Sequence, residues 1–399
     1  MATSESIGAI SLGLLLFQGV AFLILLSRLL KGPSRLRPLE PQSPVPQQLG
    51  LVSIVVPTLN EVERIGPCLA GLSHQSYEVR EIIVVDSCSQ DGTRNKVREA
   101  QCRDPRFRLI TDDPLPSGWV GRPWALHTGF MKSSPKSQWI LNIDADTQPQ
   151  PGLVSSLVTA ADTYGYDLVS LAPQFILKSP GEWWLQPSLL MTLIYRFEPA
   201  GLSAPPERVM ANGQCFLCRR SVLDKLGGYM LAARSFCDDV TLARSAAAQG
   251  FRVGFLDGAK VVRVRMYEGA AETWREWGRS LDLKDAASPG QLGLELWLLL
   301  SVQGLPLVLS LLGAWLLPHY FSRFLLAAFG LNLLLLVIRF AMLWAIAPSY
   351  ARSQPTLAAW LFWLSPFSDP LAVLRIFLSA SQTPKQWRGR VYDTDGTTV

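Results

Sequence analysis

An apolar run, Trp139–Ile143, ends directly in two carboxylates that are one residue apart, Asp144 and Asp146. The run predicts a buried strand, so both carboxylates stand at a strand's carboxyl end, where open α/β sheets bind their ligands. In this position they can share one hard divalent cation, and Mg²⁺ or Mn²⁺ held in this way suits a diphosphate. A pair of this kind is also a common solvated turn, so the metal prediction depends on the neighbouring motifs.

Two further apolar runs end in polar loops. Val52–Pro57 leads into Thr58–Glu61, and Ile82–Val85 leads into Asp86–Thr93. Both runs predict buried parallel strands followed by helices. Because the carboxyl ends of parallel strands meet at one edge of the sheet, three strand ends should converge on one ligand.

Four motifs, in this order, resemble those of the family 2 glycosyltransferases, which have the GT-A fold. They are Val56–Glu61, Val85–Thr93, Asp144–Asp146 and Cys237–Leu242, within Leu51–Glu276. The resemblance implies an α/β fold class: a GT-A, Rossmann-like nucleotide-diphospho-sugar transferase domain. The apolar segments at both ends of the chain add transmembrane helices to it.

The resemblance also implies roles for the residues of the first three motifs. The nucleotide would be bordered by Pro57, Asn60 and Glu61. Asp86 would contact the base. Local turn and helix-capping chemistry is the alternative explanation for both Asp86 and Asp91. Asp144 and Asp146 would flank the diphosphate and its Mg²⁺ or Mn²⁺.

The segment Gly118–Gly129 looks like a further element of the family, in which Arg122 stands in the place of a lysine and His127 in the place of an asparagine. Arginine keeps the positive charge but replaces a point donor by a planar fork, so a diphosphate contact by Arg122 is expected. For His127, packing and ligand contact are both open.

Asp238 and Asp239 precede a predicted helix that continues to Gly250. At a helix N-terminus the backbone dipole stabilises negative charge, so capping alone would justify one carboxylate. By the resemblance, Asp239 matches the general base that takes the proton of an acceptor hydroxyl, and Asp238 matches its acidic neighbour. A placed base contributes about 10²–10⁴ in rate.

Acceptor-side residues are less distinctive. Gln214, after Gly213, resembles the family's acceptor strand. Polymerising members carry Gln-x-x-Arg-Trp after the base, whereas this chain has Trp274, Arg275 and Trp277 without that glutamine, which weakens the case for processive synthesis. These three side chains are expected to close over donor or acceptor, or else to anchor at the membrane.

Cys215 and Cys218 form a Cys-x-x-Cys pattern. It lies on a predicted strand, where the two side chains point to opposite faces. We therefore expect core packing rather than a zinc site.

Hydrophobic residues make up 49% of the chain and charged residues 17%, too apolar for an ordinary soluble enzyme. Ile7–Ser27 has no charge and is long enough to cross a bilayer core of about 30 Å. Basic residues follow it directly, at Arg28 and Lys31. This order predicts an uncleaved anchor over residues 1–31, with the N-terminus outside and the rest starting in the cytoplasm.

The remaining chain divides by composition. Residues 32–50 are Pro-rich and should form an extended, unpacked linker, and residues 51–290 the cytoplasmic transferase domain. Leu292–Leu317 and Phe324–Ala347 predict a transmembrane hairpin. Arg339 inside the second span is expected to snorkel to the cytoplasmic face.

The last apolar stretch, Leu357–Ala380, contains Pro366, Asp369 and Pro370. A straight helix would bury the carboxylate and break at the prolines, so a re-entrant or interfacial pair of helices is expected within residues 291–381. Residues 382–399 would then be a cytoplasmic tail. The net charge of +5 is explained by basic residues facing anionic lipid, and nothing indicates a nucleic-acid partner.

The apolar stretch Leu185–Phe197 predicts an interfacial helix that presents a lipid hydroxyl. The architecture is thus similar to that of ceramide-type and bacterial carotenoid glucosyltransferases. The expected function is inverting transfer of one hexose from a nucleotide sugar, UDP-glucose foremost, to a carotenoid or sphingolipid-like acceptor. The alternatives are a processive polysaccharide synthase and a catalytically silent membrane scaffold.

Overall fold

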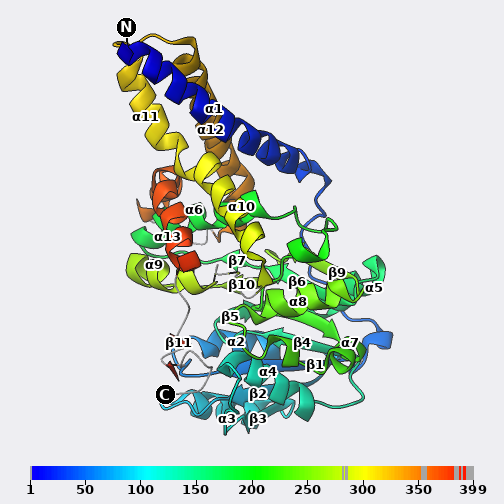
Figure 1. The fold of residues 1–399 in the computed structure, drawn as a ribbon. Coiled ribbons are helices and arrows are strands. Elements are labelled where there is room, and N and C mark those ends of the chain that lie inside the picture. Colours follow the sequence, from blue (N-terminus) through cyan, green and yellow to red (C-terminus); the bar gives the residue numbers. More distant parts are fainter. Residues whose placement is uncertain are drawn as a thin grey trace. The chain divides into compact units, whose positions relative to one another are not determined.

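The computed structural model describes residues 2–280, 283, 286–351, 357–381, 386–387 and 390–391 (Figure 1). The chain divides into two compact units. The sheet unit comprises residues 35–176, 200–266 and 384–399, and the helical unit comprises residues 1–34, 177–199 and 267–383. The predicted tail, residues 382–399, lies mostly outside the described residues.

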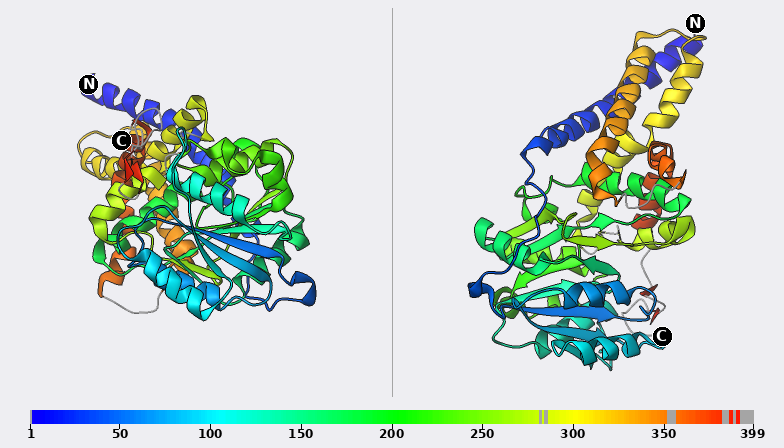
Figure 2. Two further views of the ribbon diagram at one scale, coloured as in Figure 1. Left: turned by 90° about the horizontal axis from the view of Figure 1, so that it is seen from below. Right: turned by 180° about the vertical axis from the view of Figure 1, so that it is seen from behind.

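A seven-stranded mixed sheet forms the centre of the sheet unit (Figures 1 and 2). In sheet order the strands are β3 (Phe107–Thr111), β2 (Val79–Asp86), β1 (Val52–Thr58), β4 (Trp139–Ile143), β8 (Cys215–Arg219), β6 (Leu168–Ala172) and β9 (Val253–Asp257). Strands β3, β2, β1 and β4 are parallel, and β8 runs antiparallel to both of its neighbours. The predicted α/β class and the three predicted parallel strands are confirmed.

Side chains of the sheet alternate between two apolar cores. Along β1, Ile54 and Val56 face one core, whereas Val55 faces the other. The first core is covered by α2 (Ile65–Ser73), α3 (Thr93–Arg103) and α5 (Leu153–Tyr164), and the second by α4 (Gly121–Lys132), α7 (Arg220–Leu226) and α8 (Asp238–Ala248). Cys215 and Cys218 divide between these cores as predicted.

Short strands complete the sheet unit. They are β5 (Thr147–Pro149), β10 (Val262–Val264) and β7 (Gln174–Phe175), which form a three-stranded sheet, and the pair β11 (Gln386–Trp387) and β12 (Arg390–Val391). β5 follows Asp146 at once, so pairing of β5 with β10 fixes the chain just after the carboxylate pair.

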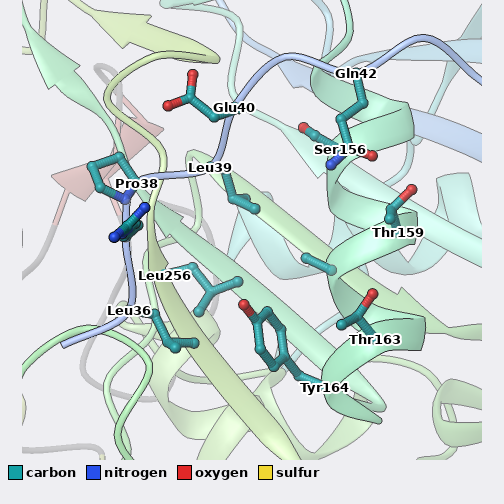
Figure 3. A pocket seen from close by; sticks show the side chains of 12 residues that line it. Leu36, Pro38, Leu39, Glu40, Gln42, Ser156, Thr159, Thr163, Tyr164 and Leu256 are labelled. Atoms are coloured by element: carbon teal, nitrogen blue, oxygen red, sulfur yellow. The ribbon is translucent and has the colours of Figure 1, made fainter. Parts of the chain in front are cut away.

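The prediction that residues 32–50 stay unpacked is wrong for the part that begins at Leu36. Gln48 is buried, with its side chain bonded to Ser155 and Thr159 of α5. Leu39 packs against the first core and donates its N–H to the carbonyl of Asp257. Figure 3 shows residues 36–42 passing over a cleft beside α5. The prolines keep this segment extended, while Leu36 and Leu39 pack against the first core and Gln48 bonds to α5.

The helical unit is built from helices at both ends of the chain. They are α1 (Ala2–Leu29), α6 (Pro180–Arg196), α9 (Gly269–Ser280), α10 (Pro289–Leu299), the π-helix η6 (Leu300–Gly304), α11 (Pro306–Leu316), α12 (Arg323–Ile346), the 3₁₀ helices η8 (Leu357–Phe362) and η9 (Ser365–Ser368), and α13 (Asp369–Ser381). Among the described residues, α1 and α12 are long and apolar enough to cross a membrane. The bent pair from Pro289 to Leu316, kinked by 48° at the π-helix and Pro306, is a third candidate.

Polar side chains bond the membrane helices to one another. Gln18 of α1 and Asn332 of α12 exchange two side-chain hydrogen bonds of 3.0 Å, and Gln18 also donates to the carbonyl of Ser301. All these groups are buried. The N-terminal helix is therefore a packed member of the helical unit.

The predicted snorkelling of Arg339 is wrong. Its side chain is 2% exposed and its Nε donates to Asp369 Oδ2 at 2.8 Å. Arg339 also donates to the hydroxyls of Ser188 and Ser365. A partner thirty residues later in the sequence thus pairs with the guanidinium inside the protein, and snorkelling is unnecessary.

The prediction that Leu185–Phe197 is an interfacial helix that presents a lipid hydroxyl is wrong for most of its side chains, because protein buries them. Helix α6 contacts η8, η9, α9 and α13, and its Leu185, Leu189 and Met191 are buried. Its position at the centre of the helical unit explains why it is apolar.

Candidate active site

The loops after β1 and β2 are bonded to each other. Asn60 lies in the left-handed region, with φ of 54°, which turns its backbone N–H onto Ser89 Oγ at 2.9 Å. Its side-chain Oδ1 accepts from the N–H of Gln90 at 2.9 Å. The N–H of Glu61 donates to Thr93 Oγ1 at 2.8 Å. Together with Pro57, buried at the end of β1, these bonds hold the two predicted nucleotide-binding loops as one surface.

Two carboxylates of the second loop have different settings. Asp86 is fully buried, accepts from the N–H of Ser89 at 3.1 Å and lies 3.6 Å from Arg94. Asp91 accepts from the N–H of Val62 and from Thr93. Although burial opposes ionisation, these hydrogen bonds lower the pKa of Asp91. The local turn role therefore accounts for Asp91.

Arg122, in the first turn of α4, joins the two acidic motifs. Its Nη2 donates to Asp144 Oδ1 at 2.8 Å, and its Nη1 donates to Asp238 Oδ2. The carbonyl of Gly213 accepts from Nη2 at 2.9 Å. The motif after β4 and the motif at the start of α8 are thus connected through one planar guanidinium, a bridge that a lysine could not reproduce.

Gly213 completes this arrangement. Its N–H donates to Asp239 Oδ2 at 2.6 Å, while its carbonyl binds Arg122. A Cβ on residue 213 would lie 2.4 Å from Arg122 Nη2. An added Cβ would therefore require the Arg122 guanidinium to move, whereas glycine lets one peptide segment bind both Arg122 and Asp239. The sequence indicated Gly213 only as part of an acceptor strand.

Asp238 and Asp239 differ in exposure and in partner. Asp238 is 4% exposed and paired with Arg122, whereas Asp239 is partly exposed and has no direct bond to Arg122. Burial and the neighbouring Asp238 raise the pKa of Asp239 to about 6, against the lowering effects of Arg122 and two backbone N–H groups. Burial also raises the pKa of Asp238. Asp239 is therefore the better placed to accept a proton near neutral pH.

Gln214 lies beside the carboxylate pair. Its carbonyl accepts from the N–H of Asp144 at 3.3 Å. Asn212 holds its side chain, donating from Nδ2 to Gln214 Oε1 at 3.2 Å and accepting the N–H of Gln214 at 3.0 Å. Asn212 was not predicted, because an asparagine before a strand gives no signal beyond a turn.

The residues present fit a divalent cation whose remaining ligands would come from the substrate and from water. Within the described ranges, no three His, Cys, Asp or Glu side chains cluster as a metal cage. Mg²⁺ is commonly held by one or two carboxylates with substrate phosphates and water. Asp144 and Asp146 offer that donor set, since pairing of β5 and the bond from Thr147 Oγ1 to the carbonyl of Asp144 fix the turn between them.

The tryptophans predicted to close over the substrate lie in α9, in the helical unit. Trp277 is 7% exposed, whereas the side chain of Arg275 is largely exposed. Arg375 donates to the carbonyl of Trp274 at 2.7 Å. Their contact with a ligand stays a prediction. His127 packs between Trp119 and Trp124, and burial lowers its pKa, which favours the packing role.

Part of the sheet unit is similar to a known family of sequences. Residues 53–227 match the family model described as Glycosyl transferase family 2. The matched range includes Asp86, Arg122, Asp144 and Gln214, and it ends before Asp239.

Among curated relatives, a 4,4'-diaponeurosporenoate glycosyltransferase of Staphylococcus haemolyticus is 25% identical over 231 residues, 58% of this chain and 60% of that protein. A polyprenol monophosphomannose synthase of Mycolicibacterium smegmatis is 26% identical over 54% of this chain and 78% of its own length. The match to the staphylococcal relative thus spans less than two thirds of its length.

Among solved structures, a mannosyltransferase of Pyrobaculum calidifontis in complex with GDP-Man and Mn²⁺ is similar, with a TM-score of 0.47 and 20% identity over 94% of this chain and 98% of that one. Glucosyl-3-phosphoglycerate synthase of Mycobacterium tuberculosis gives a TM-score of 0.39 and 19% identity over 59% of this chain and 79% of that chain.

Proposed function

Since residues 53–227 match the family model described as Glycosyl transferase family 2, we propose that this protein transfers one hexose, with inversion, from a nucleotide sugar to a hydroxyl group of a membrane lipid. The observation that carries the proposal is the setting of Asp239. Its carboxylate is partly exposed, held by the N–H of Gly213, and has a pKa of about 6.

The chemistry follows from that setting. The acceptor hydroxyl gives its proton to Asp239 as its oxygen attacks the anomeric carbon. The bond between that carbon and the diphosphate breaks, and the nucleoside diphosphate leaves with the bonding electrons. A single displacement of this kind inverts the anomeric configuration. Gly213 keeps Asp239 in place. Arg122 pairs with Asp144 and Asp238 instead, so the Asp239 carboxylate is outside a direct ion pair and stays basic.

The donor site is proposed at the joined loops after β1 and β2. Asn60, Glu61 and Pro57 would border the nucleotide, and Asp86 would contact the base. Asp144 and Asp146 would hold Mg²⁺ or Mn²⁺, which when bound would offset the negative charge of the diphosphate. Arg122 and Gln214 would line the same site.

A lipid acceptor is supported by two observations. The chain carries helices long and apolar enough to cross a membrane. The names of two relatives specify a carotenoid-derived acid and a polyprenol. We place the sheet unit in the cytoplasm because basic residues follow α1 directly. UDP-glucose is the donor to test first.

The test supplies labelled nucleotide sugars to membranes that contain the full-length protein, followed by extraction and mass spectrometry of the lipids. The parental protein is expected to yield a lipid with the mass of one added hexose, whose anomeric configuration, assigned by NMR, is inverted relative to the donor. Asp239→Asn is expected to yield about 10²-fold less. Asp162→Asn, on the exposed side of α5, is the matched control. A labelled polymer would identify a processive synthase, and no labelled product from any donor would support the scaffold alternative.

A further inference from the structure

The segment from η8 to α13 presents an apolar stripe to the outside of the helical unit. The stripe consists of Trp360, Leu364, Phe367, Leu371 and Leu374, which are 38–73% exposed. Trp360, Leu364 and Phe367 lie in or beside the 3₁₀ helices η8 and η9, and Leu371 and Leu374 lie one turn apart on α13. Contiguous exposed apolar side chains of this size are unusual on a surface that faces water.

The opposite face of the same segment is polar and buried. Ser365, Ser368 and Asp369 are 0–2% exposed. Ser368 Oγ donates to the carbonyl of Trp184 at 2.8 Å, and Asp369 is paired with Arg339. The segment is therefore the reverse of a helix on a water-soluble protein, because its polar side chains face the protein and its apolar side chains face outward.

The stripe is continuous with a candidate membrane span. Phe367 contacts Phe340 of α12, with ring centroids 6.3 Å apart, and Trp363 contacts Trp344 with centroids 4.7 Å apart. Trp344 is itself 72% exposed. The apolar outer face of α12 thus runs directly into the stripe, and the same solvent must cover both.

The segment is too short to cross a lipid bilayer. Asp369 is bonded to Arg339, which lies about two turns before the end of α12, a rise of roughly 10 Å. Helix α13 begins at this depth and has 13 residues, about 20 Å, compared with a bilayer core of about 30 Å. Arg375 then bonds to the backbone of α9.

We propose that Leu357–Ser381 dips into one leaflet of the bilayer without crossing it, with the stripe in the boundary between lipid headgroups and acyl chains. The Arg339–Asp369 pair and the serines hold the segment at that depth. Tryptophan at the stripe's start, Trp360, suits the interface. The proposal concerns the helical unit alone and does not depend on the sugar transfer proposed for the sheet unit.

The test is spin labelling of the full-length protein in phosphatidylcholine nanodiscs. Leu364→Cys, Phe367→Cys and Leu371→Cys are labelled singly in a background with the exposed Cys102 and the partly exposed Cys88 replaced by serine. Collision with oxygen and with a water-soluble nickel chelate gives the depth of each label. Leu334→Cys, exposed near the middle of α12, is the deep reference, and Met131→Cys, exposed on α4, is the aqueous reference.

The three stripe labels are expected to collide more with oxygen than with nickel, as at Leu334, but at shallower depth and all from one leaflet. Nickel access equal to that at Met131 would overturn the proposal. A depth series that passes the bilayer centre would show a true span and would overturn it too. Shielding from both reagents would mean that a protein surface, from a second copy or another chain, covers the stripe.

Discussion

The backbone N–H of Gly213 donates a hydrogen bond to Oδ2 of Asp239 at 2.6 Å. Because the carbonyl of the same glycine accepts from Arg122, one peptide segment orients the proposed base and the cation that joins the two acidic motifs. Asp239 is therefore held by a backbone segment at which a side chain would displace the Arg122 guanidinium.

Gly213→Ala is expected to lower the rate of transfer by up to about 10²-fold, since a misplacement of about 1 Å near the chemistry costs that much. The added Cβ would displace Arg122 and, with it, the segment that holds Asp239. Single-turnover transfer is the measurement. Gly66→Ala in α2, where a Cβ meets nothing within 4 Å, is the matched control. Parental rates in both variants would show that this backbone contact does not position the base.

The pH dependence of kcat/KM should report Asp239. Burial and Asp238 raise its pKa to about 6, and only the carboxylate can accept a proton. The value of kcat/KM is therefore expected to be level above about pH 7, to be about half of that level near pH 6, and to fall about tenfold for each further pH unit below. Asp239→Asn should lose this inflection along with most of its rate, whereas Asp162→Asn should keep it. An unchanged inflection in Asp239→Asn would assign it to another group.

Removal of the divalent cation should strongly weaken donor binding, because the negative charge of the diphosphate would then face Asp144 and Asp146 without a cation to offset it. Asp146→Asn is expected to weaken the binding of a nucleotide sugar and to raise the Mg²⁺ or Mn²⁺ concentration required. Asp144→Asn should also slow the chemical step, since Asp144 is bonded to Arg122. Equilibrium dialysis with labelled donor separates these effects, and binding that persists in EDTA would contradict the metal site.

The sequence predicted the sheet edge well because its signals are local. Continuous apolar runs such as Trp139–Ile143 are buried on both faces, and the polar residues that follow them must lie at the carboxyl edge. The bridge formed by Arg122 could not be predicted in this way. It joins residues 22 and 116 positions away, and the resemblance pointed instead to a diphosphate contact.

Residues in the helical unit were harder to predict for a related reason. Hydropathy identifies α1 and α12 as spans, but it assigns every apolar helix to lipid and every charge to the membrane surface. Helix α6 is apolar because protein covers it, and Arg339 is buried because Asp369 pairs with it. Both features depend on tertiary contacts, which cannot be predicted from the periodicity of the sequence.

The Arg339–Asp369 pair yields the last prediction. Removing one partner leaves a buried charge, so Arg339→Met or Asp369→Leu alone should destabilise the protein by about 3–5 kcal/mol, whereas the double variant should recover most of that loss. Thermal unfolding in detergent measures all four proteins of the cycle. The exposed pair of Lys260 and Glu40 is the control, where removal of either charge should cost less than about 1 kcal/mol. Additive losses at Arg339 and Asp369 would show that the two charges are solvated separately and that no ion pair holds α13 to α12.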